Sequence, residues 1–279
     1  MKYRIILIGL LSIIFAFQSC NKIEEPYLIE TGEIQAKKTI LIEEFTGHQC
    51  PNCPRGAKAI DDIVSVYGDR VVIVAVHANF NGRTTAAFPA EYRTEVGNTI
   101  DDKFKMEHSG LPKCMVNRIG YPEDKHKIQP EELAGKVSEV ISEDPLMDIK
   151  VIGNYDEASR KTNFVVNITL LEEMQRKLNL SVFITESNIV SPQKNNEPDF
   201  GPTPQIDDYV HNYVLRGSVN GAWGDIICIG NLNPAGTNFS RPYQYTLDPD
   251  WNENNCSLVA FVYDPDTSEV LQAAEIKVK

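Results

Sequence analysis

The chain has 279 residues, which is enough for two domains with substantial cores. Apolar residues make up 42% of it and charged residues 24%, the balance of an ordinary globular protein. The formal net charge is −12, and no basic patch compensates for it, so the composition argues against nucleic acid or an anionic membrane surface as a partner.

The first twenty residues read as a lipoprotein signal. Lys2 and Arg4 form a positive start, and the apolar run over residues 5–17 is too short for a comfortable membrane span. Ser19, a small residue, directly precedes Cys20, as in a bacterial lipobox. We therefore expect a signal peptide over 1–19 and lipid attached to Cys20, which would hold the protein on a membrane. The alternative is an ordinary secretory signal with a chance cysteine.

Residues 20–36 are polar and acidic, so we interpret them as a tether between the lipid and the folded chain. Position 21, directly after the cysteine, is asparagine and not the aspartate typical of inner-membrane retention signals. This difference favours the outer membrane. Glu24 and Glu25 resemble a short acidic surface-export tag, but two glutamates are a weak signal. The sequence is therefore compatible with either the periplasmic or the cell-surface face of the outer membrane.

Two cysteines, Cys50 and Cys53, follow a short apolar strand-like run over residues 39–45 and precede a helical pattern over 54–67. A strand, a turn and C-x-x-C at the start of a helix form the redox arrangement of the thioredoxin fold. Unpaired N–H groups at a helix start stabilise a thiolate, the form that attacks disulfides. We therefore predict Cys50 as the nucleophile, the more exposed and more acidic thiol of the pair, and Cys53 as the resolving thiol. Zinc uses similar spacing, but no second ligand pair with local spacing is present. A static disulfide is the other alternative.

A carboxyl group is expected beneath this pair of cysteines. Glu44 lies six residues before Cys50, where burial would raise its pKa and allow it to relay the proton of Cys53. Glu43 should point to the opposite face of the strand. The alternative for Glu44 is a solvated strand residue. His48 either tunes the Cys50 thiolate when protonated or is a plain surface histidine.

A proline opens the strand expected over residues 113–117. Pro112, after Gly110 and Leu111, matches the cis-proline loop that thioredoxin-like domains place opposite their dithiol. The backbone of Leu111 would then pair with an extended substrate chain. The alternative is a trans proline at a strand entrance. Cys114 is either a third thiol near the pair or a buried strand residue.

The remaining pattern predicts two domains. Residues 37–143 read as an α/β thioredoxin-like domain, with a further strand over 71–77, helical material over 88–106 and a helix over 130–143. Residues 144–279 contain short strand-like runs separated by turn clusters, which predict an all-β antiparallel sandwich of the Ig-like class. The polar loop over 193–208 is expected to be a mobile surface feature.

Cys228 and Cys256 both lie in or beside the expected strands of the second domain. Export would place them in an oxidising compartment, where an even number of cysteines favours pairing. We expect them to lie close together, and a structural disulfide between them is one expected pairing. No phosphate-binding glycine loop or Ser/His/Asp pattern occurs, so neither a cofactor nor a metal is expected.

Three stretches together resemble the outer-membrane-protein-28-related lipoproteins of Gram-negative bacteria. They are Leu41–Pro54 (LIEEFTGHQCPNCP), Tyr209–Arg216 with Gly221–Gly224 (YVHNYVLR and GAWG), and Leu258–Ala273 (LVAFVYDPDTSEVLQA). The resemblance implies an exported, lipid-anchored protein with a thioredoxin-like domain and a β-sandwich. Gln49 stands where thioredoxin has tryptophan, and the pair Pro51-Asn52 differs from the glycine-proline pair of cytoplasmic reductases.

Two functions of different classes fit these observations. The first is a thiol–disulfide oxidoreductase of the outer envelope, acting on protein thiols or disulfides. It uses Cys50, Cys53, Glu44 and Pro112 as catalytic residues and Leu111 as a binding residue. The second is a non-catalytic surface binding module that has a structural disulfide and contacts a surface partner. The direction of electron flow does not follow from the spacing of the cysteines.

Overall fold

The computed structural model describes residues 36–279. The predicted signal peptide, Cys20 and nearly all of the predicted tether lie outside the described residues. Within 36–279, no helix is both long and apolar enough to cross a membrane.

Two parallel strands, buried on both faces, carry the cysteine motif at one end of the large sheet. β1 (Ile40–Thr46) pairs in parallel with β2 (Val71–His77), and every residue of both strands is buried. Such burial accounts for their near-continuous apolar sequences. β3 (Lys113–Val116) runs antiparallel along the other edge of β1.

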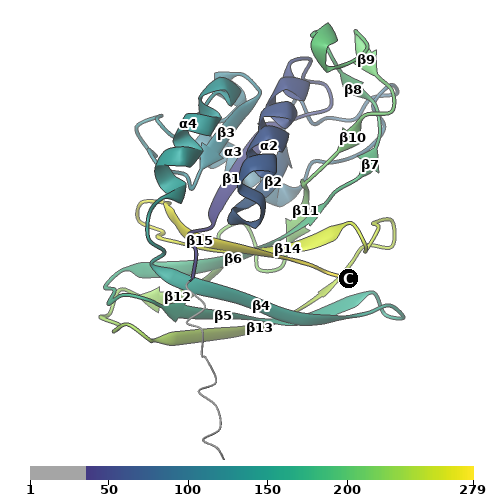
Figure 1. Cartoon of the computed structure of the whole chain (residues 1–279). Helices are drawn as coiled ribbons and strands as arrows, with labels where there is room; N and C mark the ends of the chain where they lie inside the picture. Colours follow the sequence, from purple (N-terminus) through teal and green to yellow (C-terminus); the bar gives the residue numbers. More distant parts are fainter. Residues whose placement is uncertain (1–35) are drawn as a thin grey trace, which may run out of the picture. The chain divides into compact units, whose positions relative to one another are not determined.

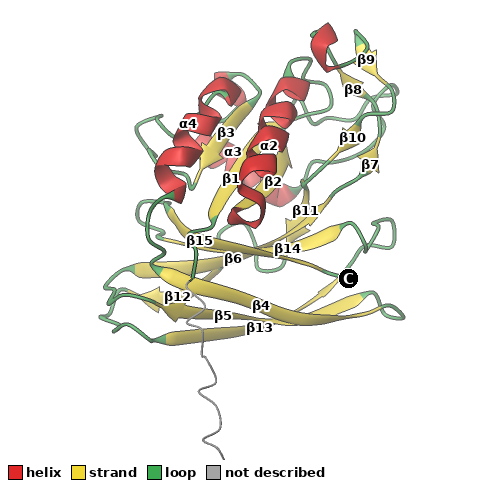
Figure 2. Cartoon of the chain, in the orientation of Figure 1, coloured by secondary structure: helices red, strands yellow, loops and turns green. Residues whose placement is uncertain are grey.

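Three α-helices within residues 36–279 cover these strands (Figure 2): α2 (Cys53–Tyr67), α3 (Glu95–Phe104) and α4 (Pro130–Ile141). α2 and α4 pack on the face of β1 that carries Ile40 and Ile42. α3 packs on the opposite face, against Leu41 and Phe45. Because successive strand residues point to opposite faces, β1 supports both layers of helices.

The same sheet continues into the second half of the chain (Figure 1). Its order is β15-β14-β6-β11-β2-β1-β3, with β12 also paired to β6. The added strands are β6 (Lys177–Glu186), β11 (Val214–Ser218), β12 (Asp225–Ile229), β14 (Cys256–Tyr263) and β15 (Val270–Lys277). The junction is a parallel pairing of Val214 with Ala75 of β2, where the Ala75 N–H donates to the Tyr213 carbonyl at 2.8 Å.

The predicted fold class is therefore wrong. A thioredoxin-like α/β domain followed by a separate Ig-like sandwich would have two sheets with independent cores, whereas one mixed sheet crosses residue 143. One hydrophobic cluster also contains Val72 and Phe45 together with Phe183 and Phe261 from the second half. The physical reason is the free edge of β2, which β11 joins through the pairing of Val214 with Ala75.

A second, three-stranded antiparallel sheet packs against the far part of the large sheet (Figure 1). Its strands are β4 (Met147–Asp156), β5 (Lys161–Leu170) and β13 (Asn238–Thr246). Apolar residues of β4 and β5, such as Val166 and Ile168, share a core with Leu180 of β6 and Leu258 of β14.

Two short paired segments lie beside the start of α2 (Figure 1). β7 (Ile189–Val190) pairs with β10 (Val210–His211), and β8 (Gln193–Lys194) pairs with β9 (Gln205–Ile206). The 3-10 turn over Pro198–Phe200 lies between β8 and β9. The loop that we expected to be mobile is thus a hairpin with its own pairing.

Candidate functional site at the Cys50–Cys53 disulfide

Cys50 and Cys53 form a disulfide in the turn that joins β1 to α2, with their Cα atoms 5.4 Å apart. Cys53 is the first residue of α2, and Cys50 precedes the helix in a turn closed by its N–H to the Gly47 carbonyl at 2.9 Å. A β-carbon at Gly47 would lie 2.5 Å from the Asn81 backbone, so only glycine fits there.

Neither cysteine is exposed, since Cys50 has 3% of its surface accessible and Cys53 has 2%. We predicted Cys50 to be the more exposed of the two, and these values do not distinguish the cysteines by exposure. The β8–β9 hairpin covers the turn and bonds to its carbonyl groups. Sequence reasoning did not connect this hairpin with the motif, because about 140 residues separate the two in the chain.

Glu44 is buried on the α2 side of β1, and its Oε1 atom has no hydrogen-bond partner among the described residues. Burial, and then the nearby charge of Asp61, raises the pKa of Glu44 to about 8. Glu43 lies on the opposite face, as predicted. Glu44 is thus a carboxylic acid that holds its proton at neutral pH.

Glu44 and Cys53 line the same small cavity of about 30 Å³, which has room for one or two water molecules. The other residues that line it are Thr46, Ala57, Ala75, His77, Gln193, Tyr209, His211 and Asn212. Cys50 does not line it. The two sulfur atoms therefore differ in their surroundings, because only Cys53 adjoins the cavity that contains the carboxyl group.

The Leu111–Pro112 peptide bond is cis, as predicted. A β-carbon at Gly56 would lie 2.7 Å from both Pro112 Cβ and Glu44 Oε1. The missing side chain of Gly56 therefore lets the first turn of α2 lie directly against Pro112 and Glu44. Leu111 is half-buried and packs against the core on the α3 side.

Cys114 is a free, fully buried residue of β3, opposite Glu44 in the antiparallel pairing of β1 with β3. Burial raises the pKa of its thiol well above the ordinary value, and the charge of Glu44 acts in the same direction. Cys114 is thus a protonated thiol of the core. This agrees with the buried-strand alternative.

Three buried histidines surround Tyr92 beside the motif. The ring centroids of His77 and His211 each lie 5.0 Å from that of Tyr92, and that of His48 lies 5.7 Å away. Burial lowers the pKa of all three, that of His211 to about 4, so they are neutral at pH 7. A protonated His48 that tunes Cys50, one of our two interpretations, is not supported, and His48 is not a surface residue either.

The sequence alone assigns no role to Gln193 or His211. From the sequence we interpret Tyr209 as core or rim of the second domain and not as part of a ligand cage, and nothing local marks Gln193. Across residues 36–279, no group of three or more His, Cys, Asp or Glu side chains has the geometry to hold a metal ion.

Cys228 and Cys256 are free and buried, so the expected disulfide between them is not formed. The reason lies in the register of β6, where Cys228 pairs with Leu178 and Cys256 with Glu186. Eight residues of strand correspond to about 26 Å. A disulfide needs Cα atoms within about 7 Å.

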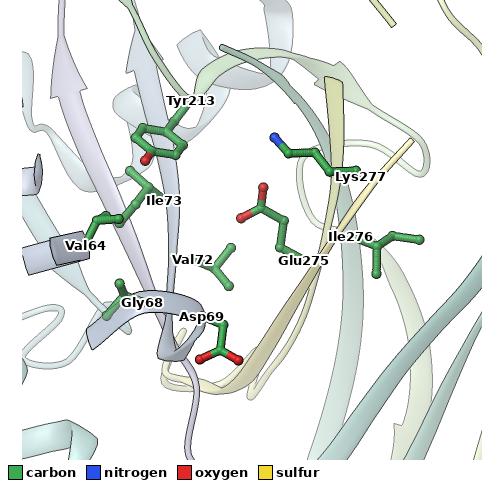
Figure 3. Close-up of a pocket in the computed structure, with 10 residues that line it drawn as sticks. Val64, Gly68, Asp69, Val72, Ile73, Tyr213, Glu275, Ile276 and Lys277 are labelled. Carbon is green, nitrogen blue, oxygen red and sulfur yellow. The ribbon is translucent and has the colours of Figure 1, made fainter. Parts of the chain in front are cut away.

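A larger cavity, of about 250 Å³, lies between the end of α2, β2 and β15 (Figure 3). Glu275 points into it from β15, Tyr213 also lines it, and Val72 and Ile73 form part of its apolar wall. None of the predicted site residues lines it.

The family model described as outer membrane protein Omp28 matches residues 98–279. The chain belongs to the Omp28 family. This membership confirms the predicted family and the outer-membrane location. The Omp28 match begins after the cysteine motif, however, so it does not cover Cys50, Cys53 or Glu44. No curated protein sequence matches the chain.

Solved structures similar to this Omp28 family protein include HBP35 of Porphyromonas gingivalis. It is 18% identical with a TM-score of 0.62, over 87% of this chain and 76% of that one. Protein AGR_C_4864 from Agrobacterium tumefaciens is 9% identical with a TM-score of 0.50, over 88% and 96%. A domain of the outer membrane lipoprotein Omp28 from P. gingivalis is 24% identical with a TM-score of 0.33, over 48% and 89%. The first two likenesses concern the fold alone.

Proposed function

We propose that this Omp28 family protein is a thiol–disulfide oxidoreductase of the outer membrane, anchored through lipid on Cys20. One observation carries the proposal. An unpaired, buried carboxylic acid, Glu44, shares a water-sized cavity with Cys53. A disulfide that only staples a turn has no use for a proton donor beside one of its sulfur atoms, and a buried carboxyl group without a partner costs stability.

Cys50 is the sulfur that exchanges with the substrate, and Cys53 is the leaving and resolving sulfur. A substrate thiolate attacks Cys50 Sγ, and a mixed disulfide forms as the Cys50–Cys53 bond breaks. Cys53 leaves as a thiolate and takes the proton of Glu44. A second substrate thiolate then attacks the substrate sulfur of the mixed disulfide and releases Cys50. The substrate dithiol loses two electrons and the protein disulfide gains them.

The pKa of Glu44 suits this step. At pH 7 a carboxyl group with a pKa of about 8 is mostly protonated, so it can donate as the Cys53 thiolate forms. In the reverse direction, the carboxylate takes the proton of Cys53, which then attacks Cys50. The same group therefore serves both directions of exchange.

Protein thiols or disulfides are the proposed partners. The cis bond before Pro112 and the contact of this residue with the first turn of α2 support a role as a platform for an extended substrate chain. In this role Leu111 provides the backbone groups that bind the chain.

Trapping tests the proposal. Cys53→Ser leaves Cys50 unable to be resolved, so mixed disulfides with partner proteins should accumulate and disappear on reduction. Cys50→Ser/Cys53→Ser is the matched control and should trap none, and Cys114→Ser should behave as wild type. Cys50→Ser should also abolish reduction of insulin by the reduced protein. Absence of any Cys50-linked partner, together with insulin reduction unchanged by Cys50→Ser, would rule out the enzyme.

A second candidate function is a non-catalytic binding module with a structural disulfide. The burial of both cysteines favours it, as does the cavity lined by Tyr213 and Glu275, which offers a surface partner an apolar wall with a carboxylate. This module would still bind its partner after Cys50 and Cys53 are both replaced by serine, whereas the enzyme would lose its exchange reaction.

A further inference from the structure

The segment Gln193–Ile206, here called the strap, lies on the cysteine turn and bonds to its backbone. The Lys194 N–H donates to the His48 carbonyl, and the Asn196 N–H donates to the Pro51 carbonyl, both at 2.9 Å. Carbonyl groups on both sides of Cys50 are therefore bound by the strap.

The side chain of Gln193 completes this contact. It is buried, and its Nε2 donates to the Cys50 carbonyl at 2.8 Å and to the Gly47 carbonyl at 3.3 Å. Gln193 also lines the small cavity that contains Glu44 and Cys53. The strap thus contacts the motif through its backbone and through an amide that reaches beside the disulfide.

One buried side chain adds to the β8–β9 pairing in keeping the shape of the strap. Asn195 is fully buried, and its Nδ2 donates to the carbonyls of Glu197, Gly201 and Pro202 at 3.0–3.2 Å. Glu197 in turn lies 3.8 Å from Arg55 at the start of α2. The strap is therefore a preformed unit that rests on the motif.

Donors two residues apart, Lys194 and Asn196, resemble the spacing with which an extended chain bonds along the edge of a strand. Such pairing depends on the backbone and not on a particular sequence, so another extended chain can form it equally well. We propose that the strap occupies the binding place of an extended partner polypeptide, which displaces it to reach the disulfide. The identity of the partner as a thiol or disulfide protein rests on the proposed function.

Displacement is required because both cysteines are buried. A thiolate must approach along the axis of the bond that it breaks, and residues with only 3% and 2% of their surface accessible, Cys50 and Cys53, obstruct that approach. The strap is the part of the cover that is held by a few hydrogen bonds and not by a packed core. Opening the strap therefore limits the rate of exchange.

The first test measures reduction of the wild-type disulfide by dithiothreitol, followed by alkylation and mass spectrometry. Gln193→Ala removes the bonds to the Cys50 and Gly47 carbonyls and should speed reduction about tenfold. Gln193→Glu places a carboxylate against the same carbonyls and should speed it further. Gln244→Ala, which removes an exposed amide bonded to Asn163 on the distant three-stranded sheet, is the matched control and should have no effect.

Alkylation of Cys228 and Cys256 in the same experiment reports unfolding of the whole protein, because both are buried in the core between the two sheets, which contains no residue of the strap. Acceleration at Cys50 with these two thiols still protected supports the proposal. The proposal would be overturned if the disulfide of both Gln193 variants were reduced at the wild-type rate. It would also be overturned if reduction became faster only where Cys256 was alkylated equally fast, because whole-protein unfolding would then explain the change.

A second measurement leaves the strap sequence unchanged. Cys53→Ser carrying glutathione on Cys50 should lose hydrogen-exchange protection at the Lys194 and Asn196 amides, compared with the oxidised wild-type protein. Full protection of both amides in that adduct would overturn the proposal. Neither test needs a natural partner, so the two hypotheses can fail separately. If the strap opens in these tests but the Cys53→Ser variant traps no partner protein, only the proposed function is contradicted.

Discussion

Arg118 and Glu43 are joined by two hydrogen bonds of 2.7 Å in the protein interior, with side chains 0% and 1% exposed. The guanidinium also lies 5.1 Å from the ring centres of Phe104 in α3 and Phe261 in β14. The pair therefore connects the motif strand β1 to the part of the sheet formed by the second half of the chain. Nothing in the local sequence around Glu43 predicts this partner, which lies 75 residues away.

Arg118→Leu should be strongly destabilising, because it leaves the Glu43 carboxylate buried without a partner. The expected loss is about 3–5 kcal/mol in the free energy of unfolding measured with urea. Replacing both residues by leucine should cost less than the single change. The exposed pair of Lys58 and Asp62 provides the control, and Lys58→Ala should cost no more than about 0.5 kcal/mol. A loss below about 1 kcal/mol for Arg118→Leu would contradict the buried pairing.

Glu44→Gln should change the pH dependence of stability. The folded carboxyl group has a pKa of about 8, against an ordinary value of 4.5, so the folded state binds more protons than the unfolded state between these values. Wild-type stability relative to Glu44→Gln is therefore highest below pH 4.5. As the pH rises above 4.5, the free energy of unfolding of the wild type relative to Glu44→Gln falls by about 1.4 kcal/mol per pH unit. The fall ends near pH 8, where the folded carboxyl group ionises.

Urea unfolding of both proteins at pH 5, 6, 7 and 8 measures this difference. Glu139→Gln, at an exposed glutamate of α4, is the control for replacing a surface carboxyl group by an amide. A wild-type minus Glu44→Gln difference that stays constant from pH 5 to pH 8 would show that Glu44 is not a protonated, buried acid.

Gly56→Ala should be destabilising by about 1–3 kcal/mol, because its β-carbon would meet the Pro112 ring and the Glu44 carboxyl group. Gly135, in the middle of α4, has no atom within 4 Å of the place that a β-carbon would take. Gly135→Ala should therefore stabilise the protein by about 0.5–1 kcal/mol. Thermal unfolding of the two variants measures both changes in stability. An equal increase in stability for Gly56→Ala and Gly135→Ala would contradict the close approach of α2 to Pro112.

Much of the motif half could be predicted from the sequence, because its signals are local. The run before Cys50 is a buried strand, the residues after Cys53 form a helix, and the alternation along β1 places Glu44 and Glu43 on opposite faces. The cis bond before Pro112 also followed from its position relative to C-x-x-C.

The rest depends on pairings between distant segments. The attachment of β11 to the free edge of β2 merges the two expected domains, and each strand has an unremarkable sequence. The cover over Cys50 combines backbone bonds of Lys194 and Asn196 with the amide of Gln193, which is indistinguishable from a surface glutamine in the sequence. The register of β6 separates Cys228 from Cys256, and the cysteine count contains no information on register.

The reduction potential of the Cys50–Cys53 pair tests the central claim most directly. The protein is equilibrated with glutathione buffers of graded ratio at pH 7, and alkylation with mass spectrometry gives the oxidised fraction. An exchanging pair should have its midpoint between about −120 and −270 mV, the range of thiol–disulfide oxidoreductases. A midpoint below about −300 mV, typical of structural disulfides, would contradict the enzyme and favour the binding module.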